Sequence, residues 1–165
     1  MLYSHTGGFM NNPMNISAFI QHVRQGNNHG PISFIRGQTT NEVETNRTAI
    51  VPIATTNNLT RAVGLITCAS VIYVSTAPNA LAIAYVHHAN AGYLAPQDII
   101  DAGNALGSPP WNTILVIFAH PKATDKWYAD SITRLIAQGI PNTNIVEIEN
   151  LITGCYGINN LGQIG

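Results

Sequence analysis

This sequence has little charge. Charged residues make up 9% of the 165 residues, and seven Lys and Arg against eight Asp and Glu leave a net charge of −1. Proteins that bind nucleic acid or anionic membranes rely on clustered Lys and Arg, so we expect neither partner. The hydrophobic fraction is 45%, and a chain of this hydrophobicity and low net charge does not match the composition of disordered proteins.

Cysteines and long apolar runs are also scarce. Cys68 and Cys155 are too few for a disulfide scaffold and form no metal-binding motif, although one bridge between them or one catalytic thiol both remain open. The longest apolar run, residues 63–74, is interrupted by Thr67 and Ser70, and it is shorter than the roughly 20 residues of a membrane-spanning helix. The first residues lack the charged and apolar regions of a secretory signal. We therefore expect a protein outside the membrane, exported, if at all, without a cleaved signal.

The remaining pattern predicts a single domain over residues 1–165 with both helices and strands. Periodicity and turn residues predict helices at 15–23, 96–105 and 125–138, strands at 31–36, 48–54, 69–75, 81–88, 113–119 and 144–149, and a polar loop at 37–46. Pro52 indicates that its strand lies at an edge or a bulge. The order of these elements favours a compact α+β fold in which a mixed or antiparallel sheet is layered against helices.

The predicted hairpin of residues 69–75 and 81–88 carries chemistry at one end. Cys68 precedes its first strand, and the pair His87 and His88 closes its second strand. A free cysteine is usually a small buried apolar side chain. Here, however, an imidazole on the partner strand can take the thiol proton, and backbone N–H groups around Cys68 can hold an oxyanion. Neighbouring side chains of a strand point to opposite faces, so only one of the two histidines can serve Cys68.

A metal site is the competing interpretation of the histidine pair. It requires a third ligand, for which His120 and Asp98 are the candidates, and neither lies at a helical or hairpin spacing from the pair. We therefore expect no metal and no other cofactor.

Two segments resemble the catalytic core of a known family. Residues 64–71, which contain Cys68, and residues 84–92, which contain both histidines, are similar to the cysteine–histidine core of the CheD-like deamidases. That superfamily includes the chemotaxis receptor deamidase, the catalytic domains of the cytotoxic necrotizing factors and the Burkholderia lethal factor. The segments 113–119, 125–138, 145–149 and 153–163 are similar to later parts of these proteins in the same order. The resemblance implies a CheD-like deamidase fold and hydrolysis of a glutamine side-chain amide in a target protein.

The resemblance also implies roles for individual residues. Cys68 corresponds to the nucleophile, and His88 matches the family's histidine better than His87 does. The family's third active-site residue is commonly a threonine six positions before the cysteine, where this chain has Ala62. Thr60, Thr67 or a backbone carbonyl group is then the candidate that orients the imidazole.

The function expected on these grounds is that of a protein-glutamine deamidase. By resemblance it is a monomeric bacterial toxin or effector, secreted to act on a protein substrate in a target-cell cytoplasm, or else a protein of the bacterial cytoplasm. A cysteine protease or a transglutaminase can use the same pair of residues. A non-catalytic binding protein with the same fold is the third alternative.

Overall fold

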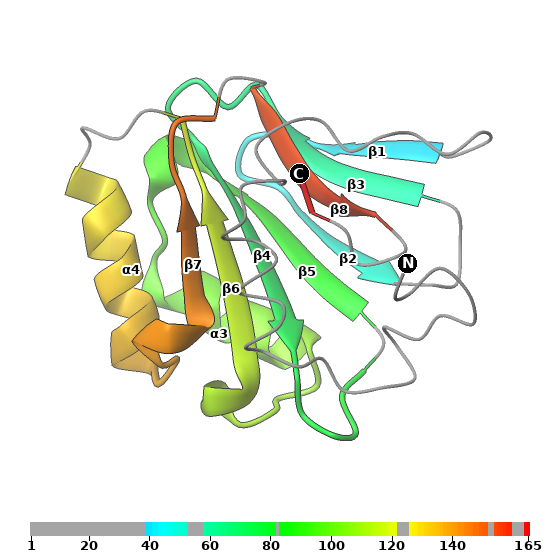
Figure 1. Cartoon of the computed structure of the whole chain (residues 1–165), viewed down its shortest axis with the longest axis vertical. Helices are drawn as coiled ribbons and strands as arrows, with labels where there is room; N and C mark the ends of the chain where they lie inside the picture. Colours follow the sequence, from blue (N-terminus) through cyan, green and yellow to red (C-terminus); the bar gives the residue numbers. More distant parts are fainter. Residues whose placement is uncertain (1–38, 53–57, 82, 122–125, 152–153, 160–163) are drawn as a thin grey trace.

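The computed structural model describes residues 39–52, 58–81, 83–121, 126–151, 154–159 and 164–165. Within them the chain forms two mixed sheets and two α-helices (Figure 1). The strands are β1 (Thr39–Val43), β2 (Thr48–Pro52), β3 (Asn58–Val63), β4 (Ala69–Ser75), β5 (Ile83–Ala89), β6 (Ile114–Ala119), β7 (Ile145–Ile148) and β8 (Cys155–Asn159). The helices are α3 (Pro96–Ala105) and α4 (Lys126–Gln138), with short 3-10 turns at Asn90–Gly92, Trp111–Thr113 and Asn142–Asn144.

The larger sheet has the strand order β2-β5-β4-β6-β7. Strands β4 and β6 lie inside it and are buried along their whole length, which explains why neither sequence alternates between apolar and polar residues. Strand β5 pairs antiparallel with β4, as the predicted hairpin requires. Strands β6 and β7 are parallel, and α4 makes the crossover between them.

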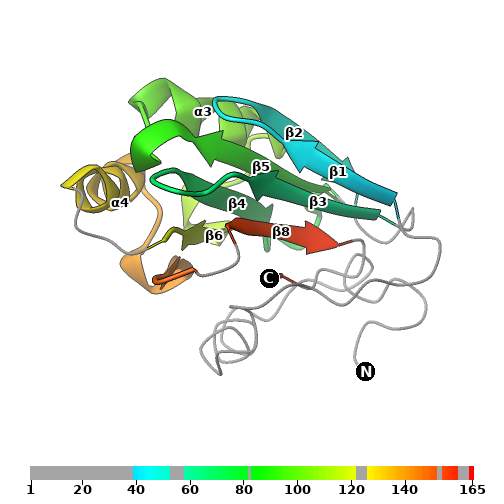
Figure 2. The ribbon, with the colours of Figure 1, turned by 90° about the horizontal axis from the view of Figure 1, so that it is seen from above.

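The smaller sheet has the order β1-β3-β8 and covers one face of the larger sheet. The apolar side chains between the two sheets form the inter-sheet core, which includes Val43, Ala62, Cys68, Ile72, Val86, Ile117 and Tyr156. The opposite face of the larger sheet packs against α3 and α4. This helix-side core includes Ala69, Val71, Tyr73, Leu94, Ile99, Phe118, Tyr128 and Leu135. Figures 1 and 2 both show α4 at one side of the molecule and the smaller sheet at the other.

The α+β fold class predicted from the sequence is confirmed, with sheet and helix layers in contact. The predicted helix at 96–105 is α3, and Pro96 occupies its first turn, where a missing N–H costs nothing. Pro52 lies on β2, which is an edge strand of the larger sheet, as expected. Cys68 and Cys155 are both free, so no bridge joins them.

The polar loop predicted for residues 37–46 is wrong, because Thr39–Val43 forms β1. Among its described side chains only Val43 is buried, so this strand has no apolar alternation to reveal it. Its pairing with β3 comes from the register of the smaller sheet, which the sequence pattern does not contain. The helix predicted at 15–23 and the strand predicted at 31–36 lie outside the described residues. Among the residues that the structure does describe, no helix combines the length and apolar character needed to cross a bilayer.

Gly157 provides a test of how closely β3 and β8 approach. A methyl group at this position would collide with the backbone of Thr60 and Arg61 on the neighbouring strand. We therefore expect Gly157→Ala to lower the free energy of unfolding by about 1–3 kcal/mol, the usual cost of overpacking. Asn41→Ala, at an exposed position of the same sheet, should change it by less than about 0.5 kcal/mol. Urea unfolding followed by circular dichroism measures both, and equal stability of the two variants would contradict the close approach.

Candidate active site

Cys68 lies directly before β4 and is 7% exposed. Its side chain belongs to the inter-sheet core, on the same face of the larger sheet as Ile72. The thiol donates a hydrogen bond to Oδ1 of Asn90, with 3.7 Å between sulfur and oxygen. Since Ala69 pairs with Ala89, Cys68 lies opposite Asn90 in the continuation of the ladder. The thiol is therefore held just before the start of β4, beside the end of β5.

His88 lies on the same face as Cys68. It pairs directly with Ser70, which places it diagonally across the two strands from Cys68. Diagonal neighbours have Cα atoms roughly 7–8 Å apart, which is within reach of a long side chain. Val86, two residues earlier on β5, is a member of the inter-sheet core together with Cys68. Strand alternation and register thus bring Cys68 and His88 to one face of the sheet.

The ring of His88 is fixed by a contact with the smaller sheet. Its Nδ1 lies 2.8 Å from the carbonyl oxygen of Val43, and because a carbonyl only accepts, Nδ1 carries the hydrogen. The backbone of His88 also bonds to the loop that follows Val43, through the amide of Asn46 and the carbonyl of Arg47. The side chain is fully buried, and its Nε2 has no hydrogen-bond partner among the described residues. A neutral ring held in this way leaves the lone pair of Nε2 free.

Among the described residues, neither of the candidate third residues, Thr60 and Thr67, forms a hydrogen bond with the ring of His88. Thr60 is a buried residue of β3 on the same side of that strand as Ala62, which packs in the inter-sheet core. The side chain of Thr67 is exposed, and its carbonyl accepts a hydrogen bond from the hydroxyl of Tyr128. Among the described residues, only the carbonyl of Val43 hydrogen-bonds to the ring of His88.

The turn before β4 presents backbone amides beside the thiol. Gly64 adopts the left-handed conformation that glycine favours, and Leu65 is tied to the carbonyl of Gly154. Within the described residues, the amides of Thr67 and Cys68 donate to no acceptor outside the strand ladders. Backbone amides without an acceptor are the kind of donor that an oxyanion requires.

Sequence patterns did not identify three residues of this site: Val43, Asn90 and Tyr128. Val43 contributes its backbone carbonyl, which every residue type has, so the sequence cannot single it out. Asn90 lies two residues after His88, and residues at this spacing in a strand lie on one face, so this pattern could have identified Asn90. Tyr128 lies on α4, far from Cys68 along the chain, and no local pattern connects the two.

His87 faces away from this site. It lines a cavity of about 610 Å³ on the helix side of the sheet. The cavity is lined by Asn46, Thr48, Tyr85, His87, Asn90, Ala91, Tyr93, Asp98, Asp101 and Trp127. Burial lowers the pKa of His87, and the nearby Asp98 opposes part of this change. Asn90 lines the cavity and also accepts the hydrogen bond of Cys68, so the Asn90 side chain connects the cavity with the thiol.

The lowered pKa of His87 has a consequence for stability. The unfolded chain takes up a proton at His87 near its ordinary pKa of 6.5, whereas the folded chain takes it up only at lower pH. The contribution of the neutral His87 side chain to the free energy of unfolding is therefore present above pH 6.5 and is lost as the pH falls below it.

We expect His87→Gln to reduce the loss of unfolding free energy between about pH 7.5 and about pH 5.5, because glutamine does not titrate. Urea unfolding of the two proteins at both pH values measures this difference. His88, Asp98 and Asp101 act electrostatically on His87, so the difference reports His87 together with its interactions with these three groups. Identical losses would contradict the assignment.

Comparison with known proteins does not assign a family. No protein-family model matches the chain, and no curated protein matches it. A crystal structure of a Neisseria meningitidis protein of the DUF152 family is similar over 79% of this chain, with 8% sequence identity and a TM-score of 0.38. This chain spans 66% of that protein's length. A similarity of this size establishes neither a shared fold family nor a shared activity.

Proposed function

We propose that this chain is a protein-glutamine deamidase in which Cys68 is the nucleophile and His88 the general base and acid. The observation that carries the proposal is the state of the His88 ring. Its Nδ1 is held by the carbonyl of Val43, and its buried Nε2, on the face of the sheet that carries Cys68, has no hydrogen-bond partner within the described residues. A buried polar nitrogen without a partner is costly for a fold, and a catalytic role is one reason to retain it.

The contact with Val43 supplies what a catalytic histidine needs. In cysteine and serine hydrolases, a third group holds the imidazole in the tautomer whose other nitrogen can accept the nucleophile's proton. A backbone carbonyl meets this requirement as a hydrogen-bond acceptor at Nδ1. With this carbonyl as the acceptor, neither Thr60 nor Thr67 is needed to orient the ring. The site can then function with Ala62 at the position where the CheD-like deamidases commonly have a threonine.

The chemistry follows from these positions. The thiol turns from Oδ1 of Asn90 toward Nε2 of His88 and transfers its proton there. The thiolate sulfur forms a bond to the carboxamide carbon of a glutamine, and the oxyanion accepts hydrogen bonds from backbone N–H groups near Thr67 and Cys68. His88 then protonates the departing ammonia, which leaves a thioester. Water, deprotonated by His88, attacks the thioester, and the products are glutamate and the free thiol.

Low exposure of the thiol favours a substrate that reaches it with a narrow side chain. Cys68 is 7% exposed, which suits a glutamine side chain projecting from a protein better than a polypeptide backbone. This favours deamidation over proteolysis. Transglutamination shares the thioester, and an amine takes the place of water in its second half.

The cysteine variants give the direct test. We expect the purified protein, incubated with bacterial and mammalian cell extracts, to convert particular glutamines to glutamate. Each conversion raises the peptide mass by about one dalton, because NH₂ is replaced by OH. Cys68→Ser and His88→Gln should each lower the rate by roughly a thousandfold or more, since the nucleophile and its base act as a unit. Peptide mass spectrometry measures the conversion.

Cys155→Ser is the matched control, because it removes the second free thiol of the chain and leaves Cys68 in place. It should retain activity. The proposal fails if no glutamine changes in either extract, or if Cys68→Ser is as active as the wild type. A primary amine added to the reaction separates the alternatives, since its incorporation into glutamine would indicate a transglutaminase.

A further inference from the structure

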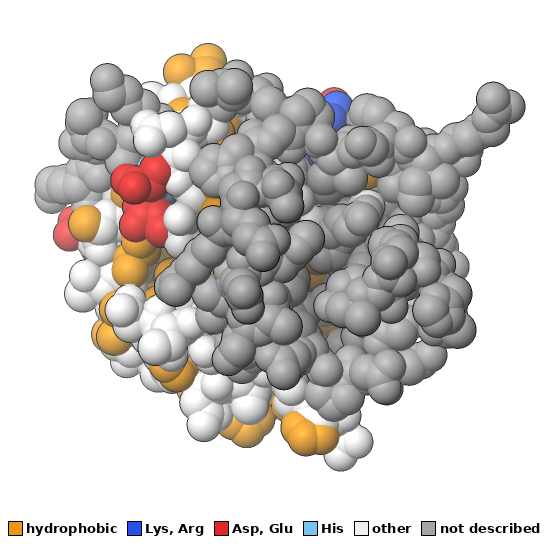
Figure 3. All heavy atoms as spheres, in the orientation of Figure 1, with side chains coloured by type: hydrophobic (Ala, Val, Ile, Leu, Met, Phe, Trp, Pro, Cys, Tyr) orange, Lys and Arg blue, Asp and Glu red, His pale blue; other side chains and the backbone are white. Residues whose placement is uncertain are grey.

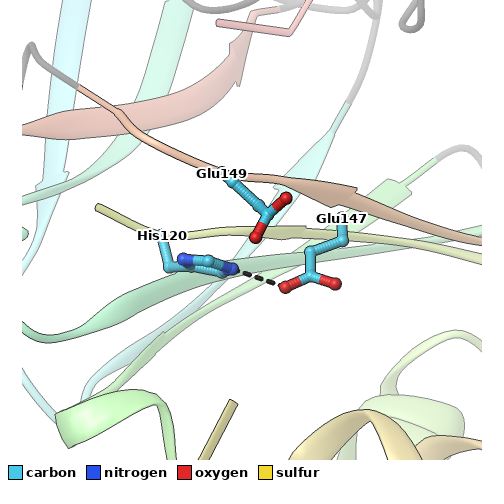
Figure 4. Close-up of side chains that lie close together, drawn as sticks. All are labelled: His120, Glu147 and Glu149. Atoms are coloured by element: carbon cyan, nitrogen blue, oxygen red, sulfur yellow. Dashed lines mark hydrogen bonds and ion pairs between the residues drawn. The ribbon is translucent and has the colours of Figure 1, made fainter. Parts of the chain in front are cut away.

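A second group of polar side chains lies at the ends of β6 and β7. His120 directly follows β6, Glu147 lies on β7, and Glu149 follows β7. One ligand atom from each of the three lies within 4.8 Å of the other two. Figure 4 shows both carboxylates turned toward the imidazole, and Figure 3 shows acidic side chains gathered on the surface near the end of β7. We call these three residues the His120 cluster.

We propose that the His120 cluster binds a zinc ion. Its histidine is oriented as a metal ligand requires. Nδ1 of His120 lies 2.6 Å from the carbonyl oxygen of Pro121, so Nδ1 donates, and Nε2 points toward the carboxylates. Histidines that bind metals usually donate their other N–H to a carbonyl or a carboxylate in this way. The ring is fully buried, which fixes its direction before any ion arrives.

The two carboxylates of the cluster favour binding of a cation. Glu147 and Glu149 are two residues apart, so strand alternation places both carboxylates on one face. Within the described part of the chain, neither forms an ion pair with Lys or Arg, and the partner of Glu147 is His120 itself. A neutral imidazole leaves two negative charges close together, and an imidazolium compensates only one. A divalent cation between the three ligands neutralises both carboxylates.

The spacing fits zinc after small movements. Bonds of about 2.0–2.1 Å in tetrahedral geometry place neighbouring ligand atoms roughly 3.3 Å apart. Nε2 and the nearest Glu147 oxygen are 2.7 Å apart, so they must separate slightly, while the widest pair must close from at most 4.8 Å. Glu147 is 37% exposed and Glu149 is exposed, so their side chains can move and solvent can reach the ion. One nitrogen and two oxygens suit zinc, whereas magnesium and calcium prefer oxygen alone.

The ion would fix the edge of the sheet that backs the candidate active site. The ring of His120 stacks on Tyr128, with 4.2 Å between the ring centres. Tyr128 in turn donates to the carbonyl of Thr67, next to Cys68. Zinc is therefore expected to stabilise the fold around this turn, and the metal itself takes no part in the thiol chemistry.

Calorimetric titration of the 165-residue chain with ZnCl₂ tests the proposal. We expect one tight site in the wild type, and a rise in melting temperature on zinc addition. Glu149→Gln and Glu147→Gln should each weaken this site by roughly tenfold or more, because each removes one ligand at an exposed position. Glu44→Gln, a change at an exposed carboxylate outside the cluster, should leave binding unchanged. Titration with MgCl₂ should give no comparable binding.

Two results would overturn the assignment. The first is the absence of zinc binding, or binding that survives both Glu147→Gln and Glu149→Gln. The second is loss of the tight site in Cys68→Ser, which would place the ion at the thiol. The proposed deamidation does not depend on the ion, so failure of the zinc titration and failure of the glutamine assay are separate results.

Discussion

The hydrogen bond between Nδ1 of His88 and the carbonyl of Val43 is the contact on which the candidate active site depends. It joins the two sheets of the fold. Strand β5 of the larger sheet supplies the ring, and β1 of the smaller sheet supplies the acceptor. Because the carbonyl can only accept, the bond selects one tautomer and leaves Nε2 buried, with no hydrogen-bond partner in the part of the chain that the structure describes. Without the smaller sheet, no carbonyl of Val43 would fix the orientation and the tautomer of the imidazole.

The rest of the fold holds that contact in place. The two cores on opposite faces of β4 and β6 fix the register of the larger sheet, because a slip of one residue would exchange the side chains of the inter-sheet core with those of the helix-side core. That register places His88 opposite Ser70 and diagonal to Cys68. On the other side, Tyr128 of α4 holds the turn before Cys68 through the carbonyl of Thr67. Thiol and imidazole are thus positioned from two layers that pack on opposite faces of one sheet.

The sequence predicted the larger sheet and its helices because their signals are local. Residues 69–75 and 113–119 are apolar runs, and Pro96 and Gly139 mark the start of one helix and the end of the other. The smaller sheet was missed. Its strand β1 is polar and lies at an edge, and its pairing with β3 depends on contacts between distant segments. Alternation in β5 correctly separated His87 from His88, since His87 lines the helix-side cavity and His88 faces the inter-sheet core. The acceptor at Val43 could not be predicted, because any residue type supplies a backbone carbonyl.

The His120 cluster could not be predicted either, because it also depends on contacts between distant segments. The sequence makes His120 a candidate third ligand for the His87–His88 pair, and no sequence spacing connects it with Glu147 and Glu149. The parallel pairing of β6 and β7 brings the ends of these strands together and so creates the cluster. Parallel strands are separated by a crossover, so residues that meet at their ends are always distant in sequence.

The most direct test of the central claim is the tautomer of His88 in solution. A long-range ¹H–¹⁵N correlation spectrum of the histidine rings distinguishes a hydrogen on Nδ1 from one on Nε2, and comparison with His88→Gln assigns the signal. The structure predicts that the neutral ring carries its hydrogen on Nδ1, bonded to Val43, with Nε2 free to accept the proton of Cys68. A hydrogen on Nε2 of the neutral ring would contradict the proposed role of His88 as the base.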